Sequence, residues 1–297
     1  MPIPPHKVPN VCFVHMDIIE SDKSDFATHV PIRTRELFTN KMNLHLVYAG
    51  NIDEQKMKDV GIVCHQIKSS WAKVPIVAGL LLFIKLVSVG REYQITAFEN
   101  IWSFRKMPIL LLAARISKSK CIARIPGVVG IYKSSDSFIK RFLKTVYRFY
   151  EKHTLNLCDC VHVLSKSLQK EYLSRGVLLS KMHVISQGVN THKFAYNPKL
   201  ADGDKFKLLI VSRLEPIKSI DTVIYALSAL VDNGCNNVEL TIVGTGADYI
   251  RLVQKIYELK IDKYIHFYGY IHNFDVYKIY QNYKAKPKSP KKKEEGN

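Results

Sequence analysis

Several features that would assign a function directly are missing from this 297-residue sequence. It has no Gly-x-Ser-x-Gly nucleophile elbow and no Walker phosphate loop, and its eleven histidines show no metal-ligand spacing. The longest apolar run, Val74 to Ile84, is too short to span a bilayer, which takes about 20 residues. The first residues do not resemble a secretory signal peptide. We therefore expect a cytoplasmic protein.

Cysteine is scarce and scattered. The sequence has six cysteines, and the only close pair, Cys158 and Cys160, has no second pair to complete a zinc site. We interpret all six as buried, reduced thiols, as is typical of a cytoplasmic protein.

Acidic residues are few compared with basic ones. The 26 Asp and Glu are outnumbered by 44 Lys and Arg, which gives a formal net charge of +18. The lysine-rich residues 284–297 predict a disordered tail. The excess charge favours an anionic partner, which could be a nucleotide diphosphate, nucleic acid or anionic lipid. Charge alone does not choose among these, and a merely solubilising surface would also explain it.

Short apolar runs alternate with longer segments of helical periodicity through the first two thirds of the chain. This alternation predicts an α/β domain with a mainly parallel sheet. The predicted strands are 11–15, 44–48, 61–66, 94–98, 121–125, 160–164 and 183–186. The predicted helices are 31–40, 74–89, 107–116, 136–157 and 166–175, and Pro31 suits the first position of its helix.

The alternation stops and then restarts. Residues 188–205 contain Gly188, Asn190, Pro198, Gly203 and several polar residues, which predicts a linker between domains 1–187 and 206–283. The second domain contains three strand–helix pairs, whereas a full doubly wound sheet has about six strands. We therefore predict an incomplete second domain, followed by the tail 284–297.

The loop after the first strand of the second domain carries two cations, Arg213 and Lys218, just before a predicted helix. Ligands of open α/β sheets bind at this carboxyl edge, and a helix N-terminus favours an anion. Arginine supplies a planar fork for phosphate, and lysine supplies a point charge. The loop is suited to a diphosphate, although two exposed cations are also ordinary on a basic protein.

The next strand ends in Val243-Gly244-Thr245-Gly246. Glycines at this position allow a ligand to approach the backbone closely. A dinucleotide-binding fingerprint would need a third glycine where Tyr249 stands, so NAD is disfavoured. A tight turn without a ligand is the alternative interpretation of Gly244 and Gly246.

Five segments together resemble family-4 glycosyltransferases of the GT-B fold. Arg213 with Lys218 is similar to their Gly-Arg-Leu-x-x-x-Lys-Gly segment, and 243–246 to their Val-Gly-x-Gly turn. The other three are Cys158-Asp-Cys-Val-His-Val-Leu-Ser165, Val184-Ile-Ser-Gln-Gly-Val-Asn-Thr-His-Lys-Phe194 and Ile265-His-Phe-Tyr-Gly269. Their order and spacing agree with the family from about residue 120 to residue 283.

The resemblance implies a retaining enzyme that uses no obligatory metal or other cofactor. Its two Rossmann-like domains would bind a nucleotide-diphosphate sugar and transfer the sugar to a hydroxyl of a sugar or lipid-linked acceptor. Arg213 and Lys218 would bind the donor diphosphate, and backbone amides near Gly244 and Gly246 would line the nucleotide pocket. The expected role is cell-envelope or exopolysaccharide assembly.

The sequence also departs from the family pattern. It contains no Glu-x₇-Glu segment to grip the donor's ribose and sugar, and Pro126 stands where a histidine commonly precedes a glycine. A truncated, inactive enzyme or a non-catalytic subunit that needs a partner chain is therefore an alternative. Binding to nucleic acid, driven by charge alone, is a further alternative that no motif supports.

Residues 138–152 form a predicted amphipathic helix that carries lysines and arginines among aromatic residues. We expect its apolar stripe to pack on the sheet, as in most surface helices. Peripheral contact with an anionic membrane, at its inner face, is the alternative.

Overall fold

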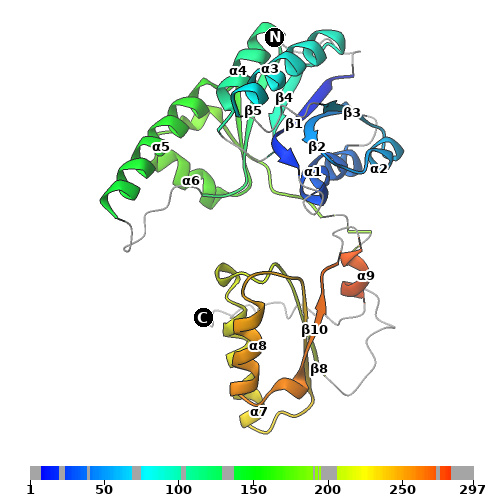
Figure 1. The fold of residues 1–297 in the computed structure, drawn as a ribbon, viewed down its shortest axis with the longest axis vertical. Coiled ribbons are helices and arrows are strands. Elements are labelled where there is room, and N and C mark those ends of the chain that lie inside the picture. The colour runs from blue at the N-terminus through cyan, green and yellow to red at the C-terminus, as the bar shows by residue number, and fades with distance from the viewer. Residues whose placement is uncertain are drawn as a thin grey trace, which may run out of the picture. The chain divides into compact units, whose positions relative to one another are not determined.

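The computed structural model describes residues 8–19, 24–38, 41–68, 75–101, 105–128, 137–189, 191–192, 194, 206–271 and 275–281. The chain forms two compact units, Met1–Gly188 and Val189–Asn297, and each is described by itself (Figure 1). The predicted tail and most of the predicted linker lie outside the described residues. None of the described helices is long and apolar enough to cross a membrane.

The first unit is built on a seven-stranded sheet in which every pairing is parallel. Its strands are β1 (Asn10–Ile19), β2 (Asn43–Gly50), β3 (Ile62–Ile67), β4 (Ala97–Asn100), β5 (Lys120–Ile125), β6 (Cys160–Val163) and β7 (Met182–Val184). The spatial order is β3-β2-β1-β4-β5-β6-β7, so the winding direction reverses between β1 and β4. This is a doubly wound, Rossmann-like sheet, and it confirms the predicted α/β class.

In the described residues, six α-helices join these strands. They are α1 (Ser24–Leu37), α2 (Glu54–Asp59), α3 (Pro75–Glu92), α4 (Met107–Ile116), α5 (Phe138–Leu157) and α6 (Lys166–Ser174). One core cluster joins strand residues such as Phe98 and Val161 to Leu86 of α3, Leu110 of α4 and Leu155 of α5. Helices α3 and α4 pack together, and α4 also contacts α5. The three helices therefore lie side by side over one sheet (Figure 1).

Two local predictions in this unit were wrong. Pro31 does not begin its helix, because α1 starts at Ser24 and Pro31 lies inside it. The flanking Val30 and Ile32 are buried, and their packing offsets the hydrogen bond that a proline cannot donate. Helix α2 was not predicted; its start is capped by Asp53, which accepts a hydrogen bond from the Lys56 amide at 3.0 Å.

The interpretation of the cysteines was right only in part. All six are free thiols, but only Cys12, Cys121 and Cys158 are buried. The other three, Cys64, Cys160 and Cys235, are partly exposed. The apolar runs of the sequence therefore did not show which of the six cysteines would be buried.

Helix α5 overturns the expectation for residues 138–152. Only Glu151, Thr154 and Leu155, near its end, are buried, and the aromatic residues of its first turns are exposed to solvent. The apolar stripe does not pack on the sheet. Periodicity reveals that a helix has an apolar face, but it does not reveal what that face meets.

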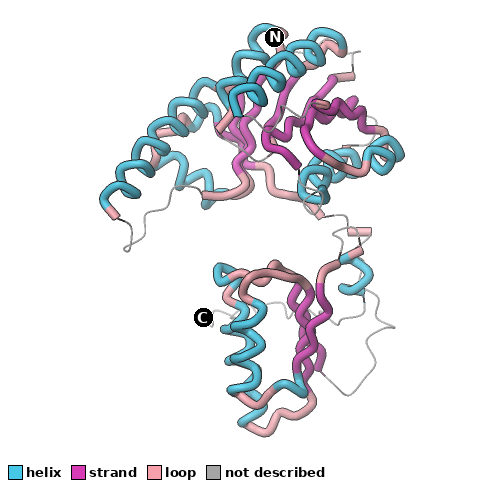
Figure 2. The backbone as a smooth tube through the Cα atoms, viewed as in Figure 1, coloured by secondary structure: helices cyan, strands magenta, loops and turns pink. Residues whose placement is uncertain are grey.

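The second unit has a smaller parallel sheet with strand order β10-β9-β8. Its elements are β8 (Phe206–Val211), α7 (Ile220–Asp232), β9 (Val238–Val243), α8 (Tyr249–Glu258), β10 (Ile265–Gly269) and α9 (Val276–Gln281). Figure 2 shows α7 and α8 on one side of the three strands. Leu227 of α7 and Leu252 of α8 share a core cluster with Leu240 and Ile242 of β9. The three predicted strand–helix pairs are thus confirmed.

Candidate functional site

The loop after β8 is anchored at its centre. Leu214 is fully buried in the core of the second unit. The chain then passes through a short 3₁₀ helix, Pro216–Lys218, and turns into α7 at Ser219, which has a left-handed φ of 49°. The side chains of Arg213 and Lys218, on either side of this anchored stretch, are both exposed. The loop therefore presents two cations from a fixed backbone at the carboxyl edge of the sheet.

The glycine loop after β9 lies directly against the Arg213 loop. A Cβ on Gly244, whose φ is 135°, would stand 2.0 Å from the Ser212 carbonyl oxygen. A Cβ on Gly246 would stand 2.2 Å from the Leu214 carbonyl oxygen. The Leu214 amide donates to the Thr245 carbonyl at 2.9 Å. Any side chain at either glycine would force the two loops apart, so the glycines are required for this packing.

The amides of the glycine loop are not equivalent. Gly244 N–H donates to the Gly269 carbonyl at 2.7 Å, so its hydrogen bond is used within the sheet edge. The N–H groups of Thr245 and Gly246 donate no hydrogen bond to another residue in the described part of the chain. Thr245 and Gly246, rather than Gly244, are therefore the available donors for a ligand.

Glu215 joins the cations of the β8 loop and was not predicted from the sequence. Its Oε1 accepts a hydrogen bond from Arg213 Nη1 at 2.6 Å, and the Arg213 side chain is 62% exposed. The Lys218 side chain has no ion pair with any described residue. A diphosphate that entered this site would bind Lys218 without displacing a partner. To bind Arg213, it would have to displace the Glu215 carboxylate.

A second ionic network ties the starts of α7 and α8 together. Arg251 donates to both carboxylate oxygens of Asp248, at 2.5 and 2.6 Å, and to Asp221 Oδ2 at 3.1 Å. The hydrogen bonds from Arg251 hold the pKa of Asp248 below its usual value. This network fixes the two helix starts that follow the candidate loops.

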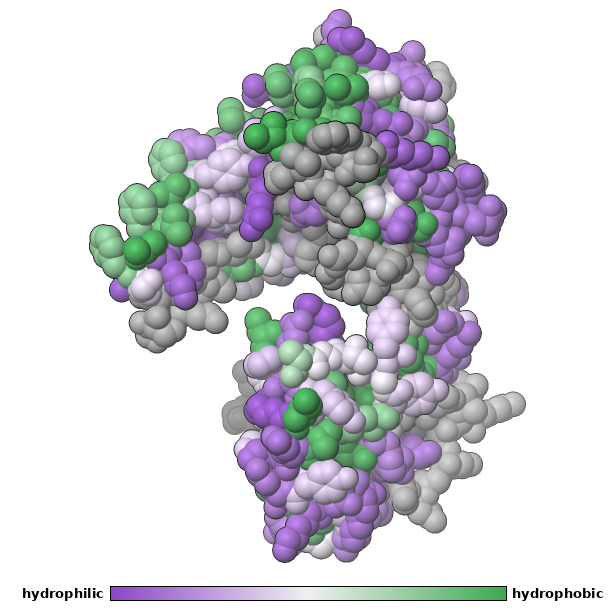
Figure 3. Space-filling model, viewed as in Figure 1, coloured by the Kyte–Doolittle hydropathy of each residue, from purple (hydrophilic) through white to green (hydrophobic). Residues whose placement is uncertain are grey.

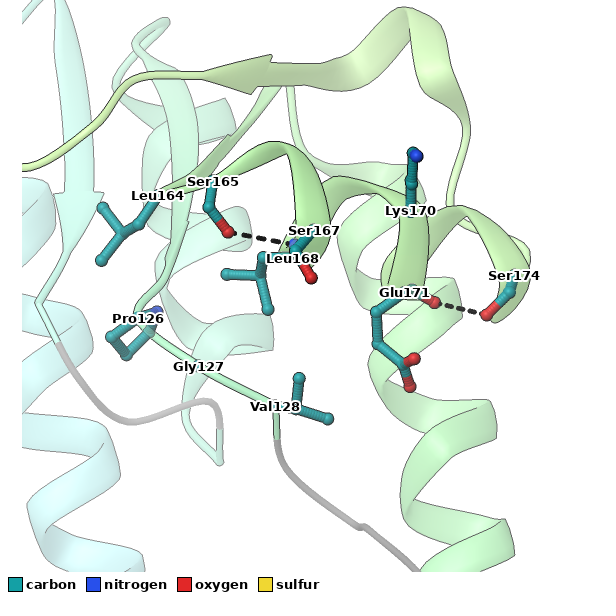
Figure 4. A pocket seen from close by; sticks show the side chains of 10 residues that line it. All are labelled: Pro126, Gly127, Val128, Leu164, Ser165, Ser167, Leu168, Lys170, Glu171 and Ser174. Atoms are coloured by element: carbon teal, nitrogen blue, oxygen red, sulfur yellow. Dashed lines mark hydrogen bonds between the residues drawn. The ribbon is translucent and has the colours of Figure 1, made fainter. Parts of the chain in front are cut away.

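In the first unit, a pocket of about 600 Å³ opens where β5 and β6 end (Figure 4). Residues 126–128 form one wall, and Leu164, Ser165 and five residues of α6 form the rest. The Ser165 hydroxyl caps α6 by accepting a hydrogen bond from the Leu168 amide at 3.1 Å. Ser167 and Glu171 of α6 add polar groups to the lining, whereas the Lys170 side chain points away from residues 126–128 (Figure 4). Such a lining can hydrogen-bond a polar ligand.

A buried ionic cluster crosses the same sheet edge. Glu99, Arg124 and His162 occupy the next-to-last positions of β4, β5 and β6. Glu99 Oε1 accepts hydrogen bonds from Arg124 Nε at 2.6 Å and from His162 Nδ1 at 3.1 Å. Burial opposes ionisation of Glu99, but the hydrogen bond from His162 and the charge of Arg124 bring its pKa below the usual value.

His162 also links this cluster to the chain after β7. Its Nε2 lies 2.9 Å from the Ile185 carbonyl oxygen, which is within hydrogen-bonding distance. His162 is buried, and its two ring nitrogens connect β6 to β4 and to the chain after β7. An apolar strand that contains one histidine gives no sign of a partner 63 residues away.

The overall architecture is that of the GT-B glycosyltransferases. The structure of a glycosyltransferase from Rickettsia africae is 16% identical in sequence, with a TM-score of 0.67 over 93% of this chain and 72% of that one. Anabaena HepE, solved with UDP, gives 14% identity and a TM-score of 0.63 over 91% of this chain and 71% of its own. The lipopolysaccharide galactosyltransferase WaaB gives 15% identity and a TM-score of 0.57 over 92% and 70%.

Family models also match the sequence. The model described as "Glycosyltransferase Family 4" matches residues 45–193, and "Glycosyl transferases group 1" matches residues 193–286. The chain belongs to glycosyltransferase family 4. No curated protein matches it significantly in sequence. The comparisons thus define the class of protein and its fold. They do not identify the sugar donor or the acceptor.

Proposed function

We propose that this protein transfers a sugar from a nucleotide-diphosphate sugar to an acceptor hydroxyl with retention of the anomeric configuration. The observation that carries the proposal is the packing of the Arg213 loop against the Gly244–Gly246 loop at one sheet edge, in a member of family 4. We place the reaction in the cytoplasm, in cell-envelope or exopolysaccharide assembly.

The proposed chemistry needs positive charge at the leaving group. The bond between the sugar C1 and the diphosphate oxygen breaks, a bond from C1 to the acceptor oxygen forms, and the proton of the acceptor hydroxyl passes to the departing diphosphate. The departing nucleotide diphosphate gains negative charge, which Arg213 and Lys218 stabilise as it develops. The N–H groups of Thr245 and Gly246 add hydrogen-bond donors from the neighbouring loop.

We assign the acceptor to the first unit. Its pocket at the ends of β5 and β6 is lined by hydroxyl groups and a carboxylate, which suit the hydroxyls of a sugar. UDP-glucose is the first donor to test, because HepE has been solved with UDP and with UDP-glucose. No metal or other cofactor is part of the proposed chemistry.

The experiment is a transfer assay with a panel of nucleotide-diphosphate sugars, UDP-glucose first, and sugar or lipid-linked acceptors. Nucleotide release is measured, and the anomeric configuration of the product is determined by NMR spectroscopy. We expect release with one preferred donor, an axial product from an axial donor, and loss of activity in the Arg213→Ala/Lys218→Ala variant. Release with no donor above the level of that variant would contradict the proposal.

The small sheet of the second unit favours a second candidate function. Strand β8 pairs with β9 and with no other described strand, so it presents an open edge. A non-catalytic subunit that gains a strand from a partner chain would use this edge. A soluble monomer that binds nucleotide diphosphate by itself, as judged by light scattering and calorimetry, would contradict this candidate.

A further inference from the structure

Helix α5 buries a carboxylate while it exposes aromatic residues. The outer end of the helix is hydrophobic at its surface (Figure 3), where Phe138 and Phe142 are 84% and 59% exposed. Glu151, by contrast, is only 3% exposed, on the buried side that also carries Thr154 and Leu155. Burying a carboxylate costs free energy unless its oxygens are paired and hydrogen-bonded. The partners of Glu151 therefore indicate what this burial achieves.

Both oxygens of the Glu151 carboxylate are bound by residues from α6 and its C-terminal end. Oε1 accepts a hydrogen bond from the Tyr172 hydroxyl at 2.9 Å, and Oε2 accepts one from Arg175 Nη1 at 3.2 Å. Tyr172 is 1% exposed, and the Arg175 side chain is 4% exposed. The Arg175 guanidinium also lies over the Tyr172 ring, 5.1 Å from its centroid. The three side chains form one buried network between α5 and α6.

This network reaches the pocket of the first unit at two points. The Tyr172 hydroxyl lies 3.3 Å from the carbonyl oxygen of Gly127, in the wall formed by residues 126–128. Arg175 Nε donates a hydrogen bond to Glu171 Oε1 at 2.9 Å, and Glu171 lines the pocket from α6. In Figure 4 the wall 126–128 lies beside the helix that carries Glu171. One network therefore contacts both sides of the pocket.

The hydroxyl of Tyr172 is the group that joins the two sides. It has one proton and two acceptors within reach, the Glu151 carboxylate and the Gly127 carbonyl. The carboxylate is the nearer acceptor, so it orients the hydroxyl, while Arg175 holds the other carboxylate oxygen. A phenylalanine ring could fill the same space without burying a polar atom. Packing alone therefore does not account for the hydroxyl, whereas a bond to the pocket wall does.

We infer that Tyr172 is a positioning residue for the acceptor, because its hydroxyl sets the distance between residues 126–128 and α6. Glu151 and Arg175 hold that hydroxyl in place. The inference rests on the proposed function, in which this pocket takes the acceptor. A displaced wall weakens the contacts of an acceptor sugar, whereas the loops proposed to bind the donor diphosphate belong to the other unit. A loss confined to the acceptor therefore separates positioning from general damage to the fold.

Transfer kinetics of Tyr172→Phe test the inference, because this change removes the hydroxyl and keeps the ring. The assay uses UDP-glucose as donor and a panel of methyl glycosides as acceptors. We expect the acceptor KM to rise about three- to tenfold, which corresponds to one neutral hydrogen bond, with kcat and the donor KM unchanged. Tyr264→Phe is the matched control, because Tyr264 is also buried and its hydroxyl donates to Asn236 Oδ1 at 2.6 Å, away from this pocket. It should leave every constant unchanged.

NMR spectroscopy gives a readout that needs no sugar transfer. Labelling glycine carbonyl carbons with ¹³C and valine nitrogens with ¹⁵N selects the Gly–Val bonds of the chain, at Gly127, Gly176 and Gly188. In Tyr172→Phe the Gly127 signal should shift, because its carbonyl loses a hydrogen bond, while the Gly188 signal serves as reference. In Tyr264→Phe neither should move.

The two readouts distinguish failure of the inference from failure of the proposed function. Absence of transfer by the unchanged chain with every donor and acceptor would count against the proposed function, and the Gly127 signal would still test the bond to the wall. An unshifted Gly127 signal in Tyr172→Phe would overturn the inference. So would a donor KM that rises together with the acceptor KM, since that pattern indicates general damage.

Discussion

The carboxyl edges of the two sheets use arginine in opposite ways. In the second unit, the Arg213 side chain is 62% exposed and shares its charge with Glu215 at the surface. In the first unit, the Arg124 side chain is 11% exposed and is held between strands by Glu99. A buried charge is tolerated only when it is paired, so Arg124 serves the fold. An exposed cation on an anchored loop can exchange its partner for a ligand, so Arg213 can serve binding.

The largest effect should come from breaking the buried pair. In Glu99→Ala, Arg124 and His162 lose their shared acceptor while they remain buried. We expect the free energy of unfolding of the first unit to fall by about 3–5 kcal/mol, as measured by chemical denaturation. Arg213→Ala is the matched control, because it breaks an exposed pair and should leave stability nearly unchanged. Equal losses in both variants would contradict the comparison.

The second-largest effect is expected from a substitution that disrupts the packing between the two loops of the second unit. In Gly246→Ala the new Cβ meets the Leu214 backbone, which cannot move without disturbing the core. We expect a loss of about 1–3 kcal/mol in stability, as for an overpacked site, together with loss of nucleotide binding. Gly234→Ala is the control: its Cβ has open space and its only cost is a left-handed backbone. If Gly246→Ala bound nucleotide normally, the loop packing would not matter for the site.

Acid should weaken the buried cluster in a defined direction. The pKa of Glu99 is lowered in the folded chain, so the stability it contributes is fully present above its ordinary value of 4.5. That contribution is lost as the pH falls through the lowered pKa, and Glu99→Gln should lack this part of the pH dependence. Thermal unfolding of both proteins between neutral pH and pH 3 measures it. Parallel curves for the two proteins would show that Glu99 does not titrate in this range.

The smallest effect sharpens the assignment of Arg213. Glu215→Gln removes the carboxylate that competes with a ligand for the guanidinium. Because an exposed pair contributes roughly 0.2–1 kcal/mol, we expect nucleotide-diphosphate affinity to rise by about two- to fivefold. Calorimetric titration detects this change. Unaltered affinity would mean that Arg213 does not contact the ligand.

The fold was predictable where local signals agree. Helix α4 was located to the residue, because its periodic apolar run is bounded by polar residues. Contacts between residues that are far apart in the sequence could not be predicted. Glu99 and Arg124 are 25 positions apart, and the sequence of neither strand indicates that the two side chains form an ion pair. The outward face of α5 was missed for the same reason, because its periodicity fits a packed helix equally well.

The candidate site was predictable only as a set of residue types. Arg213, Lys218, Gly244 and Gly246 were singled out by position after apolar strands, and the structure places the loops that carry them in contact. That the Gly244 amide is already bonded to Gly269 could not be read from the sequence. Hydrogen bonds between neighbouring loops depend on the sheet register, which a sequence of one chain does not reveal.

Calorimetric titration of UDP and UMP into the unchanged chain and into Arg213→Ala/Lys218→Ala tests the central claim most directly. The second phosphate is what the two cations are proposed to bind, so UDP should bind at least about tenfold more tightly than UMP. The double variant should bind both nucleotides with the weaker affinity. Equal affinity for UDP and UMP in the unchanged chain, or unaltered UDP binding in the variant, would contradict the assignment of this edge as a diphosphate site.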